Sequence, residues 1–233
     1  AVGHRNVGRG ENLTMKNRFK QNTLLLTLLA AGSLSAAEPL PRGYTIPTID
    51  LSAEKHRQII VDREKGQYLG HPTTVLLEDG KTMLVVYPKG HGRGGIVYKR
   101  SADGGKTWSK RLPTPASWAT SREVPTLHRV VDAKGKKRLI MWSGLYPARL
   151  AVSEDDGAKW SELKPAGDWG GIVVMGCLEE LKTGNGHYLA MFHDDGRFFT
   201  KTSKRANPVV FNLYKTFSKD GGLTWSKPES IFA

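Results

Sequence analysis

Side chains that can transfer protons or bind anions occur in several segments of this sequence, next to glycine or proline. An imidazole or a carboxylate can exchange a proton with a substrate, and a guanidinium group binds a carboxylate through two parallel hydrogen bonds. The residues of these types that we consider candidates for a site are His71, His91, Arg93, Arg122, Glu123, Arg149 and Asp194. Gathered on one face, they would have the chemistry of a glycan-binding site.

Each candidate also has a purely structural interpretation. His91 and Arg93 lie among glycines, which suit a flexible turn as well as a loop that a ligand approaches closely. Glu123 precedes Val-Pro and is equally compatible with a solvated surface acid. Asp194 is followed by Asp-Gly, which is typical of an ordinary turn. Composition alone does not choose between these interpretations.

A metal site or a redox centre has little support in the sequence. His193 precedes two aspartates, but three consecutive residues of an extended backbone cannot all face one ion. Cys177 is the single cysteine, so it forms neither an internal disulfide nor a cysteine-based metal site. Its apolar neighbours predict a buried, inert thiol. We therefore predict no metal and no other cofactor.

The elements that must position the candidate side chains contain a threefold repeat. The pattern Ser-x-Asp-x-Gly-x-x-Trp occurs at 101–108, 153–160 and 218–225, each time after a strand-like run. Its aspartate can accept backbone N–H bonds across a turn, its glycine tolerates positive φ, and its tryptophan covers the apolar side of a hairpin. We predict a structural role for its members, which are Asp103, Gly105, Trp108, Asp155, Gly157, Trp160, Asp220, Gly222 and Trp225.

Short runs rich in β-branched and aromatic residues surround each copy of the repeat and predict an all-β fold without long helices after residue 37. Four strands are expected in each of three units, which span about 66–113, 123–165 and 171–231. The expected strands are 73–77, 82–87, 96–100 and 110–112, then 127–131, 138–143, 149–152 and 162–164, then 172–181, 187–192, a run ending at 217 and 228–231.

The expected order of strands separates two faces. The turn between the first two strands of a unit lies on the same side as the repeat motif between its last two strands. The opposite face is built from the loops between the second and third strands and from the connections between units. These loops and connections hold the candidate site residues, and a rigid scaffold commonly presents functional groups in this way.

The threefold motif resembles the Asp box, or bacterial neuraminidase (BNR) repeat, of the sialidase superfamily. This resemblance covers about residues 66–231 and implies a six-bladed β-propeller, of which about three blades are present. Since three blades cannot close a ring alone, we expect this chain to be the N-terminal part of a longer protein. The alternative is a short chain that pairs with a second copy.

The resemblance also assigns roles to the candidates. Sialidases bind the sugar carboxylate with three arginines, and Gly70 stands where the first of these is expected. They use an aspartate of the first blade as acid/base; since no aspartate lies between Tyr87 and Asp103, His91 is the nearest substitute. Glu123 is then a second carboxylate or base. The predicted catalytic residues are His91 and Glu123, and the predicted substrate-binding residues are His71, Arg93, Arg122, Arg149 and Asp194.

The N-terminus has the pattern of an export signal. A basic stretch begins at Met15, an apolar run covers 23–31, and small residues end at Ala37. We expect a signal peptide at 15–37, an upstream extension that is not native at 1–14, and a mature protein from Glu38. We therefore predict a secreted or periplasmic protein without stable membrane insertion.

The net charge of +13 falls to +9 when residues 1–37 are left out. The positive residues are scattered, so we predict no nucleic-acid partner but a glycan or glycoconjugate substrate. The predicted function is a secreted, sialidase-like exo-glycoside hydrolase acting on a terminal, acidic sugar and inactive as this fragment alone. The alternatives are a non-catalytic propeller that binds a glycan or a protein and a purely structural or assembly propeller.

Overall fold

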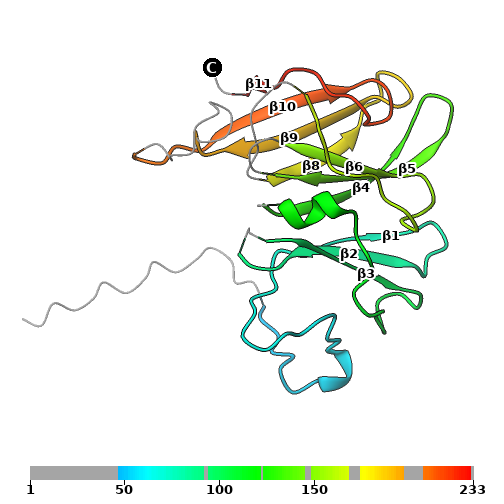
Figure 1. Cartoon of the computed structure of the whole chain (residues 1–233), viewed down its shortest axis with the longest axis vertical. Helices are drawn as coiled ribbons and strands as arrows, with labels where there is room; N and C mark the ends of the chain where they lie inside the picture. The colour runs from blue at the N-terminus through cyan, green and yellow to red at the C-terminus, as the bar shows by residue number, and fades with distance from the viewer. Residues whose placement is uncertain are drawn as a thin grey trace, which may run out of the picture. The chain divides into compact units, whose positions relative to one another are not determined.

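The computed structural model describes residues 47–91, 94–121, 123–144, 148–167, 174–196 and 207–231. A compact unit begins at Asp50, and the fold below is that of this unit (Figure 1). No helix among the described residues is long and apolar enough to cross a membrane. The regular helices within them are two short 3₁₀ segments, η1 (Lys55–Arg57) and η2 (Ala116–Thr120).

The prediction of an all-β protein is confirmed, with three antiparallel sheets following one another along the chain. The first sheet has the order β1-β2-β3, the second β4-β5-β6-β7 and the third β11-β10-β9-β8. The strands are β1 (Thr73–Leu76), β2 (Met83–Pro88), β3 (Ile96–Ser101), β4 (Pro125–Val131), β5 (Lys137–Ser143), β6 (Arg149–Ser153), β7 (Lys164–Pro165), β8 (Val174–Glu180), β9 (Tyr188–Asp194), β10 (Asn212–Ser218) and β11 (Glu229–Ser230).

Two predictions about local structure are wrong. Residues 110–112 do not form a fourth strand of the first sheet; one hydrogen bond, from the Leu112 N–H to the Tyr98 carbonyl at 2.9 Å, joins this segment to β3. Pro113 and Pro115 follow, and proline has no N–H with which to extend a ladder. Cys177 is half-buried rather than buried, because a register shift after Met175 changes the way β8 presents this side chain.

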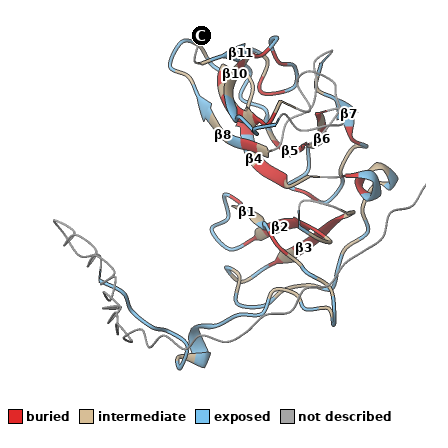
Figure 2. Ribbon diagram, turned by 90° about the vertical axis from the view of Figure 1, so that its left-hand side faces the viewer, coloured by how far each residue is buried: buried red, intermediate tan, exposed pale blue. Residues whose placement is uncertain are grey.

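The core lies between the sheets, and the central sheet contributes to it from both faces (Figure 2). In β5, Leu139 and Met141 pack toward the first sheet, whereas Ile140 and Trp142 pack toward the third. Side chains alternate between the faces of a strand, so a strand covered on both faces is apolar throughout. This explains why 139–142 is an unbroken apolar run rather than an alternating one.

The first strands of the three sheets lie next to one another, β1 beside β4 and β4 beside β8. A side chain joins the first two of them, since the Thr73 hydroxyl donates to the Pro125 carbonyl at 3.0 Å. This contact fixes the start of β1 against the start of β4. The segments that lead into both strands therefore come to the same edge of the unit (Figure 1).

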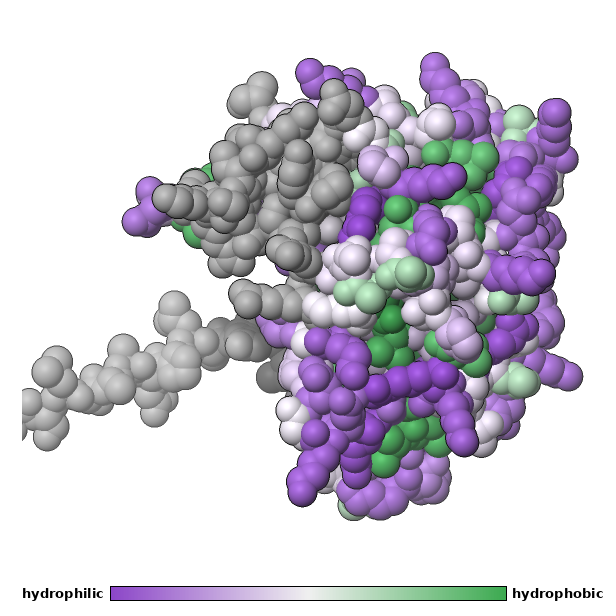
Figure 3. All heavy atoms as spheres, viewed as in Figure 1, coloured by the Kyte–Doolittle hydropathy of each residue, from purple (hydrophilic) through white to green (hydrophobic). Residues whose placement is uncertain are grey.

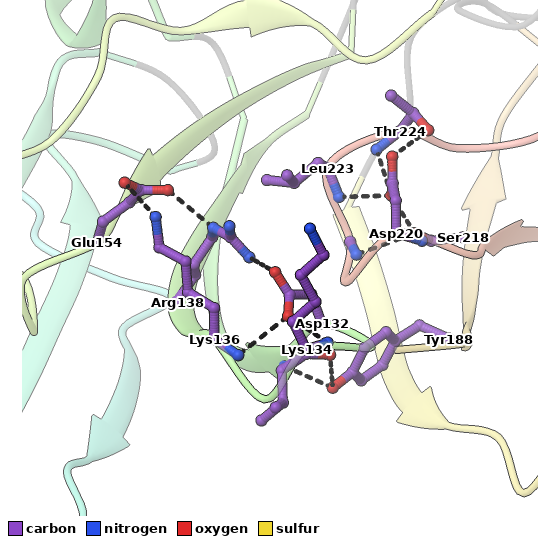
Figure 4. A network of polar contacts seen from close by, with 12 residues as sticks. Asp132, Lys134, Lys136, Arg138, Glu154, Tyr188, Ser218, Asp220, Leu223 and Thr224 are labelled. Carbon is purple, nitrogen blue, oxygen red and sulfur yellow. Dashed lines mark hydrogen bonds and ion pairs between the residues drawn. The ribbon is translucent and has the colours of Figure 1, made fainter. Parts of the chain in front are cut away.

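The opposite edge holds the β4–β5 turn and an ion network (Figure 4). Arg138 donates to Asp132 at 2.8 Å and to Glu154 at 2.9 Å, and the Tyr188 hydroxyl accepts the Val131 N–H at 2.8 Å. Polar side chains line the turn side of the molecule, with smaller apolar patches between them (Figure 3). The hydrogen bond between Tyr188 and Val131 ties the third sheet to the second.

His128, on β4, makes the stability of the fold depend on pH. Burial lowers the pKa of this imidazole to about 4, while its ring nitrogen lies 3.1 Å from the Thr126 hydroxyl. In the unfolded chain its pKa is about 6.5, so the unfolded state binds the extra proton as the pH falls from 6.5 to 4. The stabilisation is complete above pH 6.5 and is lost toward pH 4, with a total of about 3 kcal/mol.

We expect this loss to disappear in His128→Gln, which keeps a polar side chain but does not titrate. The measurement is the free energy of unfolding by urea at several pH values between 4 and 7. The carboxylates with lowered pKa also lose their contribution as the pH falls below about 5, but this loss is common to both proteins and cancels in their difference at each pH. An equal slope in both proteins would contradict the assignment to His128.

Candidate functional site

The three repeat motifs lie at the edge of the sheets where β3, β6 and β10 end, and the motif aspartates close the turns there. In the first motif the Thr107 N–H and hydroxyl donate to the Asp103 carboxylate at 2.9 and 2.6 Å. The side-chain and backbone hydrogen bonds from Thr107 lower the pKa of Asp103 to about 2. Asp220 has the same two contacts with Thr224, at 2.9 and 2.6 Å.

Most of the candidate site residues lie near the other edge, where β2, β5 and β9 end and β3, β6 and β10 begin. His71 lies two residues before Thr73, and Glu123 lies two residues before Pro125. The hydrogen bond between Thr73 and Pro125 therefore brings both segments to this edge. Arg149 is the first residue of β6 and is paired with Ser143, which in turn is paired with Pro125. The first two sheets therefore present their candidates on the same side.

His71 and His91 meet, although they are far apart in the sequence. His71 Nε2 lies 3.2 Å from His91 Nδ1, and both side chains are exposed. The two rings are inclined at 72°, and the Tyr68 ring lies 5.7 Å from that of His91. The structure therefore joins a predicted substrate-binding residue and a predicted catalytic residue in one imidazole pair.

The backbone around the imidazole pair is unusual and explains the contact. Leu69 is bridged to both Lys89 and Gly90, so the segments that carry the two histidines run side by side. His71 has a φ of +52°, in the left-handed region that non-glycine residues rarely adopt. A Cβ at Gly70 would lie 2.3 Å from the Tyr68 ring. Glycine is therefore required there as long as Tyr68 keeps its position, and an arginine does not fit.

Lys89, close to the imidazole pair in the chain, is engaged elsewhere. Its ammonium group lies 3.2 Å from Glu64, whose carboxylate also accepts from Arg111 at 2.6 Å. Arg111 donates in addition to Asp62 at 2.7 Å. These ion pairs hold the segment before β1 against the first sheet. Lys89 consequently supports the loop, and its charge is already balanced.

Arg149 is held by a residue that the sequence analysis missed. Its guanidinium donates to the Thr120 hydroxyl at 2.8 Å and to the Thr120 carbonyl at 3.1 Å. Burial lowers the pKa of Arg149, but an arginine stays charged at any physiological pH. Thr120 ends η2, and no pattern in the sequence connects it with β6. The guanidinium is thereby oriented before any ligand binds.

The short helix η2 is itself anchored to the second sheet. Glu162 accepts the N–H groups of Ala116 and Ser117 at 3.2 and 2.8 Å and also binds the Ser117 hydroxyl. Trp118 is fully buried beneath the helix, with its ring 5.5 Å from that of Trp160. A chain of contacts thus runs from the core to Arg149.

The remaining candidates differ in their surroundings. Glu123 is half-buried, and one carboxylate oxygen accepts the Val124 N–H at 3.2 Å. Asp194 is the last residue of β9 and is 1% exposed, so it is not an open turn residue. The His193 ring packs against Phe211 at 5.3 Å. Arg93 and Arg122 lie outside the described residues, as do Tyr146, Asp168 and Trp169.

The arrangement has a defined chemical capacity. One imidazole of the His71–His91 pair can pass a proton while the other orients it, and Arg149 offers a fixed positive charge. No group of three or more His, Cys, Asp or Glu among the described residues is suited to hold a metal ion. A cavity of about 410 Å³ is lined instead by Leu150, Val152, Glu154, Ser161, Lys164, Pro165 and Leu223, none of which is a candidate.

Comparison with known proteins identifies a family. A family model described as BNR repeat-like domain matches residues 51–232. None of the curated proteins matches the sequence.

Among solved structures, one is described as a protein of unknown function from Dyadobacter fermentans. It is 14% identical, with a TM-score of 0.49 over 72% of this chain and 56% of the other. A family 43 arabinoxylan arabinofuranohydrolase from Bacillus subtilis is 15% identical, with a TM-score of 0.41 over 67% of this chain and 35% of the other.

An endo-arabinase from Bacteroides thetaiotaomicron is 11% identical, with a TM-score of 0.27 over 70% of this chain and 81% of the other. The chain thus spans about half the length of the first of these proteins and about a third of the second. All three TM-scores are below 0.5, so these likenesses define neither the fold nor the activity of this chain.

Proposed function

Because the chain belongs to the family of BNR repeat-like domains, we propose that its three sheets are blades of a six-bladed β-propeller of the sialidase type. We propose further that the full-length protein is an exo-glycoside hydrolase that removes a terminal, acidic sugar from a glycan. The observation that carries this proposal is the His71–His91 pair at the edge opposite the repeat motifs, the same edge as the oriented Arg149.

In this proposal His91 is the general acid/base. It donates a proton to the glycosidic oxygen as the bond to the leaving group breaks, and His71 orients its ring through the 3.2 Å contact. Glu123 is the second acid–base group: it takes a proton from the water whose oxygen forms the new bond to the sugar carbon. A histidine in place of a carboxylic acid also reduces the negative charge that an anionic sugar meets on binding.

Arg149 is the anchor for the sugar carboxylate. Thr120 engages one N–H on each terminal nitrogen of the guanidinium, and the Nε N–H is buried, so the second N–H of each terminal nitrogen is left for the anion. Arg93 and Arg122 are further candidates for the same anion. The absence of an arginine at position 70 favours an acidic sugar other than ordinary sialic acid.

We also propose that the protein is exported and that residues 15–37 are its signal peptide. The support is the order of basic, apolar and small residues in this segment. Mass spectrometry of the protein from the culture medium or the periplasm would find a mature N-terminus at Glu38. A cytoplasmic protein that retains residue 15 would contradict export.

The hydrolase proposal is tested with terminal uronic and sialic acid glycosides and the full-length protein. His91→Gln should lower kcat by about 100-fold or more, since a lost general acid commonly costs 10²–10⁴ in rate. His187→Gln is the matched control, because this histidine lies on the β8–β9 turn and contacts Thr183 at 3.2 Å. Equal turnover by the two variants would remove His91 from the mechanism.

The alternative is a non-catalytic propeller that binds a glycan or a protein with the same face. One observation favours this alternative. Within the described residues, the hydrogen bond of His71 and His91 joins the two imidazoles to each other and not to a carboxylate. Calorimetric binding of the same acidic sugars without any hydrolysis would select this function. Turnover that depends on His91 would exclude it.

A further inference from the structure

We propose that the His71–His91 pair is a binding site for one divalent transition-metal ion, with water completing the coordination. The pair lies on two adjacent loops of the first sheet, and nothing in the family match assigns a metal to it. This inference concerns binding and does not depend on the proposed hydrolysis.

The distance between the two nitrogens fits a shared ligand. Imidazole nitrogens bind zinc at about 2.0–2.1 Å, so two of them in tetrahedral coordination are separated by about 3.3 Å. His71 Nε2 and His91 Nδ1 are 3.2 Å apart. The ring centroids are only 4.6 Å apart, so the rings meet at an angle rather than end to end. A third atom beside the pair is therefore within reach of both nitrogens.

The loops hold this geometry without help from a metal. The bridges from Leu69 to Lys89 and Gly90 fix the two segments, and the ion pair of Lys89 with Glu64 supports the second one. The left-handed φ of His71 costs free energy, and such costs are concentrated at functional sites. A pair already placed at ligand distance loses little conformational entropy when an ion binds.

The ligand set defines the class of metal. Neutral imidazole suits copper, nickel and zinc, whereas magnesium and calcium require oxygen ligands. No cluster of three His, Cys, Asp or Glu is present among the described residues, so water completes the shell. Both side chains are exposed, which leaves the ion accessible to solvent and to chelators.

If the proposed hydrolase is correct, the bound ion is an inhibitor. An ion on Nδ1 replaces the contact with His71 that orients the ring, and an imidazole with a metal on Nδ1 cannot take up the second proton that makes it an imidazolium acid. Zinc should then lower turnover, and a chelator should restore it. This consequence rests on the proposed function, whereas the binding itself does not.

The test is isothermal titration calorimetry of the tag-free, full-length protein with zinc chloride or nickel chloride, and with magnesium chloride as the negative control. We expect one zinc or nickel ion per chain and no heat with magnesium. Binding should be lost in His71→Asn and in His91→Gln. Asparagine tolerates the left-handed backbone of position 71, so the first variant removes the ligand without adding strain.

His187→Gln serves as the matched control and should bind as the unaltered protein does. Thermal melts of all variants without metal establish that each is folded. Zinc or nickel binding that survives in either of the two site variants would overturn the proposal, as would loss of binding in His187→Gln or no binding at all. The calorimetric titration needs no substrate, so it tests metal binding separately from hydrolysis. A protein that binds the ion but hydrolyses no sugar would refute only the proposed hydrolase activity.

Discussion

Gly157→Ala is expected to lower the free energy of unfolding by about 3 kcal/mol, which is large for the addition of one methyl group. Gly157 is the glycine of the second repeat motif and has a φ of +80°. A Cβ at this position would lie 2.5 Å from the Tyr98 hydroxyl and 2.6 Å from Leu84 Cδ1. Both neighbours belong to the first sheet, so the added methyl group would push two sheets apart.

The second part of the loss is a hydrogen bond. The Tyr98 hydroxyl donates to the Gly157 carbonyl at 2.8 Å in a buried position. A shift of Tyr98 away from the new methyl group would leave these polar groups without their partner, and an unsatisfied buried group is costly. The contact cannot relax easily, because Leu84 is fully buried and Tyr98 is 3% exposed.

Gly104→Ala is the matched control. Gly104 has a φ of +71°, close to that of Gly157, but among the described residues beyond its two chain neighbours no atom lies within 4 Å of the Cβ position. Gly104→Ala should lower the free energy of unfolding by about 1 kcal/mol, through backbone strain alone. Urea denaturation of both variants measures the difference. Equal losses would show that the left-handed backbone, and not the contact between the sheets, limits position 157.

This pair of glycines also shows what the sequence reveals and what it leaves open. The repeat predicts a turn that needs glycine, because that requirement is local and recurs three times. The approach of Tyr98 and Leu84 to Gly157 is long-range and leaves no local pattern. The second motif has Asp156 where the first has Gly104, and Asp156 too has positive φ, at +55°. Positive φ alone therefore does not demand glycine here.

The strands could be predicted because their residue types are local signals. The β-branched and aromatic content of 138–143 predicts a strand, and this segment lies within β5 (Lys137–Ser143). The strand predicted at 110–112 is wrong, because the two prolines that follow it prevent a ladder more strongly than the residue types of 110–112 favour one. The burial of Asp194 could not be predicted either, because the Asp-Gly that follows it is typical of an exposed turn.

The candidate site shows the same limit. The chemical types of His71, His91 and Arg149 could be read from the sequence, but their partners could not. The contact between the histidines depends on the bridges of Leu69, and the orientation of Arg149 depends on Thr120. Both are tertiary contacts between segments without any shared pattern. Whether these residues act on a substrate stays a prediction.

The second large effect is expected at Trp118, where fold and site are coupled. Trp118→Ala should destabilise the protein by about 4 kcal/mol, as removal of a fully buried tryptophan leaves a cavity. Trp118 lies in η2, whose last residue, Thr120, holds Arg149. The variant should therefore also weaken binding of an acidic sugar, if Arg149 is its anchor.

Trp118→Phe separates packing from polarity. The indole N–H of Trp118 is buried and has no hydrogen-bond partner among the described residues, so phenylalanine removes a buried polar group. Removal of this polar group offsets part of the free energy that is lost with the apolar contacts. We expect Trp118→Phe to lower the free energy of unfolding by about 1–2 kcal/mol. Urea denaturation gives the stability of both variants, and calorimetry gives their affinity for the sugar.

Trp160→Ala provides the comparison that isolates η2. Trp160 packs against Trp118 at 5.5 Å but is only half-buried and belongs to the second repeat motif. Its removal should cost less stability and leave Thr120 and Arg149 in place. If Trp160→Ala weakened sugar binding as much as Trp118→Ala, the effect would follow from general loosening of the second sheet. A loss of binding confined to Trp118→Ala would show that η2 transmits the packing of the core to the anion site.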